Sequence, residues 1–301
     1  GIEMKSFSQL TKEELYKQKN SRSCCDRAEY AGMLLFGAAI TQQSVRFVTE
    51  NQDVLSAYGV LCRNLGMEPE VHQSAEKNVR YLAENRDGVM ILQMLHDLHL
   101  IDPATGVIRY RIASELTELE CCRRALIKGG GTVIDPKKNY NLELVTPYLG
   151  LSRDMQKLLQ EAGFDFKWTR RKSKYVLYLK NSEGIADFLS YLGAFKAQME
   201  LLNIKIEKEI RNDFNRAANS ETANLEKTIN ASVQQVRAIE EVQRTIGLDS
   251  LPEDLREIAQ LRLLHKELSL SELGALMNPP LTKSGVNHRL KKLMQISCGG
   301  K

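Results

Sequence analysis

The 301-residue sequence has no long hydrophobic run. Its longest apolar stretch, YAGMLLFGAAI at residues 30–40, is much shorter than the ~18–20 residues that a membrane-spanning helix needs. The N-terminus also lacks the charged-then-apolar pattern of an export signal. We therefore expect a cytoplasmic protein with no membrane partner, folded into two or three globular domains.

The sequence also lacks the residue spacings of metal sites. Its six cysteines include two vicinal pairs, Cys24-Cys25 and Cys121-Cys122, but no C-x-x-C spacing. The five histidines are scattered, and His96 and His99 lie on a leucine-rich helix where a structural role is expected. We predict buried thiols, no metal ligands and no cofactor.

Acidic residues are absent from two windows of the chain. Between Leu273 and Lys301 the charged residues are Lys283, Arg289, Lys291, Lys292 and Lys301. Between Phe166 and Ser182 they are Lys167, Arg170, Arg171, Lys172, Lys174 and Lys180. Two basic surfaces on a chain of modest net charge, +4, indicate a polyanionic partner.

Proline and glycine are absent between Ala194 and Gly247. This segment is rich in helix formers and predicts a helical linker, either one long helix or two. The asparagines between Asn215 and Asn224 favour a break there, because short polar side chains compete for backbone hydrogen bonds. The stretch NRAANSETANLEKT either contacts phosphates through Arg216 and Lys227 or docks the linker.

An internal repeat organises the first two thirds of the chain. Residues 31–40 align with residues 124–133 at an offset of 93, which matches Gly37 with Gly130. The cysteine pairs lie at an offset of 97 and support this alignment less well. Each segment is followed by a similar pattern, so that each half reads as helix, two strands, helix, two strands, helix. We expect an α+β domain whose sheets have helices on one face.

These features resemble the LAGLIDADG fold of homing endonucleases, and from about residue 24 to about 296 the chain resembles the WhiA family of bacterial regulators. The distinctive stretches are CCRRALIKGGG, NRAANSETANLEKT and SGVNHRLKKL. The resemblance implies a duplicated αββαββα LAGLIDADG-like domain, a helical linker and an all-α helix-turn-helix domain. The boundaries we predict are an N-terminal arm at 1–23, the LAGLIDADG-like domain at 24–195 with pseudo-repeats 24–115 and 116–195, the linker at 196–247, the helix-turn-helix at 248–296 and a tail at 297–301.

In the endonucleases, each of the two paired helices ends in an acidic residue that holds a divalent cation. The nine-residue motif, laid onto Tyr30–Ala38 and Arg123–Gly131, puts Gly37 and Gly130 at the acid positions. Glycine cannot supply the carboxylate oxygens that bind Mg²⁺ and activate its water. We therefore predict no catalytic residues, and glycines that let two helices approach closely.

Three glycines in a row, at 129–131, are costly in a helix, at roughly 1 kcal/mol each relative to alanine. Close helix packing explains that cost, and a KGGG phosphate cradle is the alternative. An active nuclease with carboxylates from Glu29, Asp135 or Glu143 also remains open.

Residues 252–296 have the spacing of a helix-turn-helix. Ser269 can cap a short second helix, and Thr282 or Ser284 can start a third helix in which Val286, Leu290 and Leu293 face inward. Short polar residues followed by lysines suit a helix in the major groove. The predicted DNA-binding residues are Thr282, Lys283, Ser284, Asn287, His288, Arg289, Lys291 and Lys292. The alternative is a solvated basic face on a small three-helix domain.

A second DNA surface is predicted on a β-hairpin at residues 165–180. Its members are Lys167, Trp168, Arg170, Arg171, Lys172 and Lys174. Mixed cations and aromatics can lie along a nucleic-acid backbone, or they can form a solvated sheet face with cross-strand pairs. A further alternative makes the whole N-terminal domain a platform for protein partners.

The resemblance implies a sequence-specific transcription regulator linked to cell division, chromosome segregation and sporulation. It implies double-stranded DNA at promoters as the main partner, another transcription regulator as a second partner, and association with the nucleoid. The operator, the target genes and the oligomeric state do not follow from the sequence.

Overall fold

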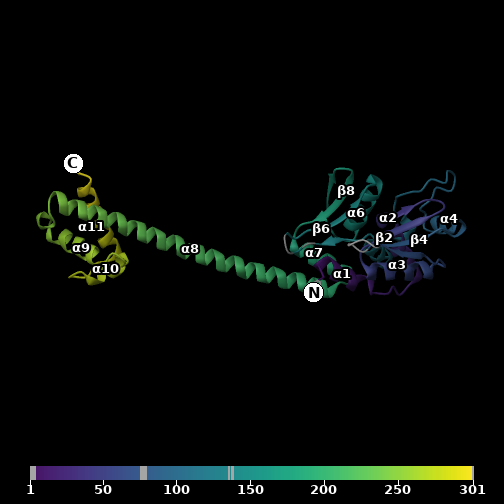
Figure 1. Cartoon of the computed structure of the whole chain (residues 1–301), viewed down its shortest axis with the longest axis horizontal. Helices are drawn as coiled ribbons and strands as arrows, with labels where there is room; N and C mark the ends of the chain where they lie inside the picture. Colours follow the sequence, from purple (N-terminus) through teal and green to yellow (C-terminus); the bar gives the residue numbers. More distant parts are fainter. Residues whose placement is uncertain (1–4, 75–79, 135, 137–138, 300–301) are drawn as a thin grey trace. The chain divides into compact units, whose positions relative to one another are not determined.

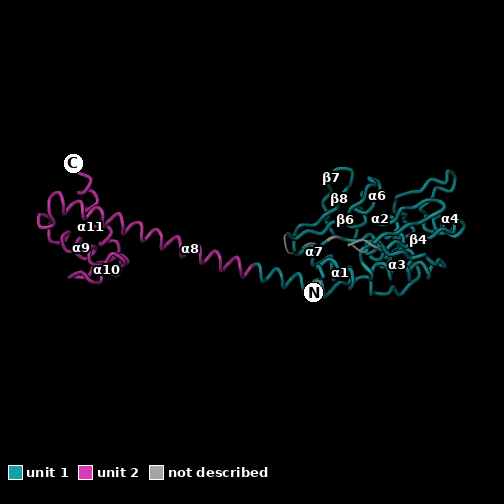
Figure 2. Tube along the Cα trace, in the orientation of Figure 1, with its two compact units in different colours: residues 1–208 teal, residues 209–301 magenta. Residues whose placement is uncertain are grey.

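The computed structural model describes residues 5–74, 80–134, 136 and 139–299 (Figure 1). The chain divides into two compact units, residues 1–208 and residues 209–301 (Figure 2). The long helix α8, Phe195–Thr245, begins in the first unit and ends in the second. Among the described residues, no helix is both long and apolar enough to span a bilayer.

The first unit contains the predicted duplication. After α1 (Phe7–Tyr16), the first repeat comprises α2 (Ser23–Gly37), β1 (Ala38–Ile40), β2 (Val45–Thr49), α3 (Gln52–Asn64), β3 (Glu70–Gln73), β4 (Tyr81–Asn85) and α4 (Gly88–Asp97). A 3-10 turn, η1 (Ser114–Leu116), leads into the second. The second repeat comprises α5 (Glu120–Gly129), β5 (Val133–Ile134), β6 (Leu142–Thr146), α6 (Leu149–Glu161), β7 (Lys167–Arg171), β8 (Lys174–Leu179) and α7 (Ser182–Tyr191).

The two repeats form two sheets with the same topology. The strand orders are β1-β2-β4-β3 and β5-β6-β8-β7, and every pairing is antiparallel. Asparagine and aspartate start the helices that follow the strands: the side chains of Asn51, Asp87 and Asn181 accept hydrogen bonds from the first backbone N–H groups of α3, α4 and α7. The predicted α+β fold class is confirmed.

Helices α2 and α5 pack directly against each other in the core of this unit. Their backbones approach closely because each contributes a glycine. A Cβ on Gly32 would lie 2.2 Å from the carbonyl oxygen of Leu126, and a Cβ on Gly129 would lie 2.1 Å from that of Glu29. The two contacts are reciprocal, since each glycine meets the residue three positions before the other glycine. Glycine at these positions is therefore a steric requirement.

This packing corrects the predicted alignment of the repeats. Gly32 and Gly129 are 97 positions apart, as are Cys25 and Cys122, so the helices align at the offset of the cysteine pairs and not at 93. Beyond the helices the offset falls to 94, because Ile40 and Ile134 pair with the first residues of β2 and β6. The second repeat lacks about one helical turn: α2 has 15 residues and α5 has 10.

The shortened helix explains the three consecutive glycines. Gly129 makes the close contact with α2, and Gly130 is the C-cap of α5. Gly131 has a φ of +69°, a backbone conformation that glycine adopts without strain. Each of the three glycines thus has its own structural role. Together they serve the packing of α5 on α2 and the termination of α5.

The predicted break in the linker is wrong, because α8 is continuous. Its threonines satisfy their hydroxyl groups within the helix: Thr222 donates to the carbonyl of Ala218, and Thr228 donates to that of Asn224. The polar cluster that favoured a break is therefore compatible with an exposed helix.

The second unit is a small helical domain. It contains the end of α8, η2 (Leu248–Ser250), α9 (Glu253–Leu264), α10 (Leu270–Leu276) and α11 (Lys283–Ser297). Its core includes Ile239 and Val242, which lie in the segment predicted as linker. The predicted inward residues Val286, Leu290 and Leu293 are all buried.

We expect Gly32→Ala or Gly129→Ala to lower the free energy of unfolding of the first unit by about 1–3 kcal/mol, the usual cost of overpacking a core. The added methyl group would force the α2 and α5 backbones apart. Chemical denaturation followed by circular dichroism measures this effect.

Gly59→Ala in α3 is the matched control. A Cβ there would lie 3.4 Å from the flexible guanidinium of Arg63, so the helix should gain about 0.5–1 kcal/mol. Equal stability of the Gly32→Ala variant and the parent protein would show that the two helices are not in steric contact.

Candidate nucleic-acid interface

Helices α10 and α11 form the predicted helix-turn-helix. Ser269 caps α10 in a capping box with Glu272. The turn after α10 closes on Gly274, whose carbonyl accepts a hydrogen bond of 2.9 Å from the backbone N–H of Leu281. A Cβ on Gly274 would lie 2.2 Å from the Leu281 carbonyl oxygen. The glycine therefore sets how closely the turn packs against α10.

Burial of one face of α11 leaves a polar face outward. Thr282 caps the helix by accepting a hydrogen bond from the Gly285 N–H. Ser284, His288 and Lys291, spaced i, i+4 and i+7, share the side opposite the core. Of the predicted DNA-binding residues, the structure exposes Thr282, Lys283, Ser284, His288, Lys291 and Lys292 and leaves Asn287 and Arg289 half-buried.

Arg289 has a partner inside the domain. Its Nε lies 3.6 Å from Oδ2 of Asp254, and one of its terminal nitrogens donates to the Asp254 carbonyl oxygen at 3.4 Å. This side chain therefore links α11 to the start of α9. The sequence could not show the contact, because the two residues are 35 positions apart.

Arg262 is a structural residue that the sequence analysis missed. It is only 2% exposed, and its guanidinium donates to the carbonyl oxygen of Leu268 at 2.7 Å. Further bonds reach the carbonyls of His265 and Lys266. Arg262 thus holds the α9–α10 connection. The sequence did contain a signal for this role, because Arg262 follows Ile258 by four residues on the buried face of α9.

Gly37 and Gly130, which the predicted alignment at an offset of 93 puts at the acid positions of the endonuclease motif, have apolar side chains beside them. A Cβ on Gly37 would meet the ring of Phe47 at 2.7 Å, and a Cβ on Gly130 would meet Phe36 at 3.3 Å and Leu144 at 3.5 Å. A side chain at Gly37 would face carbon atoms, and a side chain at Gly130 would also meet the carbonyl oxygen of Ile127 at 3.3 Å. Neither glycine has a side chain that could hold a metal ion.

Glu29, one of the alternative nuclease carboxylates, is engaged in a buried ion pair. Its Oε2 lies 3.1 Å from Nζ of Lys128, and both side chains are at most 5% exposed. Asn20 donates to the same carboxylate at 2.6 Å. Burial raises the pKa of Glu29, and Lys128 opposes that rise. The pair joins α2 to α5 beside the glycine contact, where the Tyr16 hydroxyl also donates to the Lys128 carbonyl.

Glu143, another of the alternative carboxylates, is paired with an arginine of the same sheet. Glu143 on β6 accepts two hydrogen bonds from Arg171 on β7, at 3.0 and 3.2 Å. These bonds lower the pKa of Glu143. Asp135 lies outside the described residues.

The hairpin of β7 and β8 divides the predicted second surface between two faces. Trp168 lies on the face that meets α6: its indole N–H donates to Oγ of Ser152, and Arg153 stacks over its ring at 3.8 Å. Arg170 is on the same face and lies 6.0 Å from the Tyr175 ring. The indole is therefore not available as an open stacking platform.

Two cations on the opposite face are paired with acids. Arg171 binds Glu143, and Lys167 lies 2.6 Å from Asp165. Lys172 and Lys174 are exposed at the hairpin tip. The open positive charge of this surface is therefore concentrated at its tip.

A duplicated αββαββα domain followed by a helix-turn-helix domain defines a class of proteins that join a LAGLIDADG-like fold to a helix-turn-helix module. Residues 120–211 match the model of the WhiA LAGLIDADG-like domain, and residues 214–297 match that of the WhiA C-terminal HTH domain. The chain belongs to the WhiA family.

Similar proteins match almost the full length of the chain. The "Probable cell division protein WhiA" of Caldicellulosiruptor saccharolyticus is 40% identical, covering 97% of this chain and 94% of that protein. The protein of the same name from Alkaliphilus metalliredigens is 37% identical, covering 97% of both. The crystal structure of full-length WhiA from Thermatoga maritima is 24% identical, covers 99% of both chains and has a TM-score of 0.58, which supports the fold.

We expect Lys128→Met to lower the free energy of unfolding by about 3–5 kcal/mol, since it leaves the Glu29 carboxylate buried without its cation. The double variant Glu29→Gln, Lys128→Met should lose less than the single variant, because no charge remains uncompensated. Urea denaturation measures both.

The deficit of Lys128→Met should also depend on pH. Burial already raises the pKa of Glu29, and removal of Lys128 raises it further, so the folded state binds the proton more tightly than the unfolded state. The deficit is then smallest below the ordinary pKa of glutamate and grows as the pH rises. Lys157→Met, at a surface pair with Glu161, is the control, and a deficit independent of pH would contradict the assignment.

Proposed function

We propose that this protein is a sequence-specific DNA-binding transcription regulator that acts in cell division without nuclease activity. The observation that carries the proposal is the outward face of α11. Ser284 and His288 offer hydrogen-bonding groups along the first half of the helix, and Lys291 and Lys292 follow on its second half. Such an order places polar groups at base edges and cations at phosphates.

The packing of the second unit supports this role. Gly274 and the Thr282 cap fix the turn, and Arg262 and Arg289 hold α9 against the connection and against α11. A recognition helix must be held rigidly if its side chains are to discriminate between bases. Arg262 is buried and Arg289 is half-buried, so these two supporting contacts leave the outward face free for DNA.

The non-enzymatic part of the proposal rests on the helix crossing. On the predicted alignment, glycine stands at both acid positions, Gly37 and Gly130, and the carboxylate of Glu29 is paired with Lys128. Two-metal hydrolysis of a phosphodiester needs several carboxylate oxygens around each ion. The first unit retains the endonuclease fold as a scaffold.

Membership of the family supports a finer role. The relatives are named cell division proteins, and we propose that this chain acts in the same process by binding promoters on the nucleoid. Links to chromosome segregation and sporulation, and a second regulator as partner, belong to the same proposal. The first unit is the surface on which such a protein partner would bind.

We expect Lys291→Ala and Lys292→Ala each to weaken DNA binding and to reduce the slope of log K against log salt by about 0.9 per lost phosphate contact. Ser284→Ala should instead relax sequence preference with little change in slope. Fluorescence anisotropy with the full chain and a genomic binding site measures both quantities.

Lys157→Ala, on exposed α6 in the first unit, should leave affinity and slope unchanged. Unchanged binding by both α11 lysine variants would refute the recognition helix. A drop in slope for Lys172→Ala or Lys174→Ala would show that the hairpin tip also contacts DNA, and equal slopes would leave the first unit as a protein platform.

We further expect no cleavage of plasmid or genomic DNA by the purified protein with Mg²⁺ or Mn²⁺. The physical reason is the lack of a carboxylate at either acid position. Gel electrophoresis after prolonged incubation provides the measurement. Nicking that a chelator abolishes and that Glu29→Gln or Glu143→Gln reduces would identify a relocated active site.

A further inference from the structure

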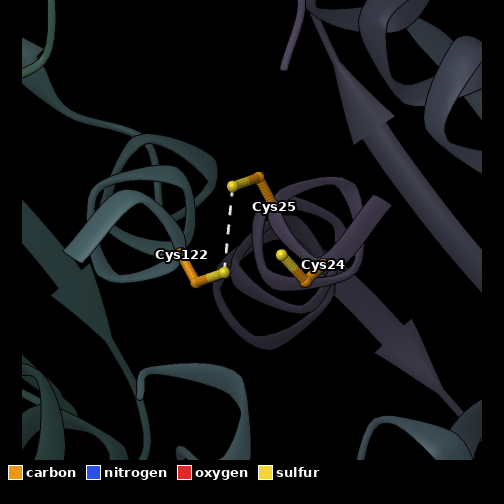
Figure 3. Close-up of side chains that lie close together, drawn as sticks. All are labelled: Cys24, Cys25 and Cys122. Carbon is orange, nitrogen blue, oxygen red and sulfur yellow. Dashed lines mark hydrogen bonds between the residues drawn. The ribbon is translucent and has the colours of Figure 1, made fainter. Parts of the chain in front are cut away.

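Thiols from both repeats meet where α2 and α5 begin (Figure 3). The sulfur of Cys25 lies 3.8 Å from the sulfur of Cys122. The Sγ atoms of Cys24, Cys25 and Cys122 all lie within 4.8 Å of one another. Three sulfur atoms so close together form a potential ligand set that no cysteine pair provides alone.

The arrangement follows the pseudo-two-fold symmetry of the repeats. Cys24 and Cys25 are the second and third residues of α2, and Cys121 and Cys122 are the second and third residues of α5. At the offset of 97, Cys121 of α5 is equivalent to Cys24 of α2, and Cys122 is equivalent to Cys25. Cys121 is half-buried and directly precedes Cys122, and its sulfur is not among the three that lie within 4.8 Å, so it is the candidate for a fourth ligand.

Two of the four thiols are shielded from solvent, and burial raises the pKa of both Cys25 and Cys122. Cys25 is 3% exposed and Cys122 is 4% exposed, whereas Cys24 and Cys121 are half-buried. The N-terminus of each helix provides a partial positive charge and free N–H groups. Both first turns are available for this purpose, because neither α2 nor α5 has a side-chain N-cap bond.

The geometry fits one metal better than others. Zinc binds thiolates at about 2.3 Å in a tetrahedron, which separates two sulfur ligands by about 3.8 Å. The Cys25–Cys122 distance has that value. An all-sulfur ligand set selects soft or borderline ions and disfavours Mg²⁺ and Ca²⁺.

We propose that Cys24, Cys25 and Cys122, with Cys121 as the fourth ligand, bind one Zn²⁺ ion that joins the two repeats. The four-thiolate site lies at the N-terminal ends of α2 and α5, away from the acid positions at their C-terminal ends. It is a structural site that couples metal binding to the stability of the helix pair.

The spacing of the cysteines explains why the sequence did not predict this site. Adjacent residues on a helix point about 100° apart, so a vicinal pair alone does not enclose an ion. Zinc motifs are recognised by two ligands separated by a short loop. Here the packing of α2 on α5 brings the two pairs together, and that packing became visible only in the structure.

The test uses the full-length protein, purified under reducing conditions and stripped with a chelator. Titration with Co²⁺ should give one equivalent of binding, with the visible bands of tetrahedral cobalt and the ultraviolet sulfur-to-cobalt band. Zn²⁺ should displace the cobalt and raise the melting temperature. Cys25→Ser and Cys122→Ser should weaken Co²⁺ binding at least tenfold.

Two controls separate a metal site from general thiol chemistry. Cys62→Ser removes a buried thiol elsewhere in the first unit, and Cys298→Ser removes an exposed one; both should bind Co²⁺ as the parent protein does. Cys24→Ser changes only a half-buried residue, so it keeps the test decisive if the buried variants fail to fold.

The proposal fails if the reduced parent protein binds no Co²⁺ or Zn²⁺ at micromolar concentrations. It also fails if Cys24→Ser and the buried variants bind metal as tightly as the parent. Peptide mass spectrometry that finds a Cys25–Cys122 disulfide in metal-free native protein would assign the cluster to redox chemistry and would likewise overturn the zinc site.

Discussion

The first unit depends on the contact between two helix backbones. Gly32 and Gly129 each occupy a position where a methyl group would overlap a carbonyl oxygen of the other helix. Helix α2 begins the first repeat and α5 begins the second. In each repeat, the first strand of the sheet comes after the end of that helix. A change in their separation would therefore move both sheets, which makes this contact the geometric reference for the whole unit.

Polar and apolar contacts lie at different places along the pair of helices α2 and α5. In the first unit, Glu29 and Lys128 form a buried ion pair beside the glycine contact, while Gly37 lies against Phe47 and Gly130 lies against Phe36 and Leu144. A buried pair contributes little net stability, but it is costly to break. Such a pair specifies one register of α2 on α5, since a slip of one turn would leave both charges unpaired.

The sequence predicted the elements better than their register. Hydrophobic periodicity and capping residues were sufficient for the duplicated α+β fold, and Ser269 and Thr282 marked the starts of α10 and α11. The offset of the repeats was wrong because a deletion of about one turn in α5 makes two alignments compete. The asparagines between Asn215 and Asn224 suggested a break, but local propensity is weak compared with the continuity of a long helix.

The candidate site was predictable only in part, for a physical reason. Helical spacing predicts which residues of α11 face inward, and the remaining residues then form its outward face. Tertiary partners do not follow from spacing: Asp254 engages Arg289, Ser152 and Arg153 enclose Trp168, and the thiols meet across two repeats. A list of basic residues therefore overstates the charge that is free to bind a polyanion.

The smaller number of free cations affects how the protein would recognise DNA. On α11 the exposed cations are Lys283, Lys291 and Lys292, and three phosphate contacts give a salt slope of only about −2.7. Proteins with many phosphate contacts bind any duplex tightly, whereas a small electrostatic contribution leaves little affinity for non-specific DNA. On the proposed function, base contacts by residues such as Ser284 and Asn287 must then supply a large share of the binding energy, which favours selectivity over affinity.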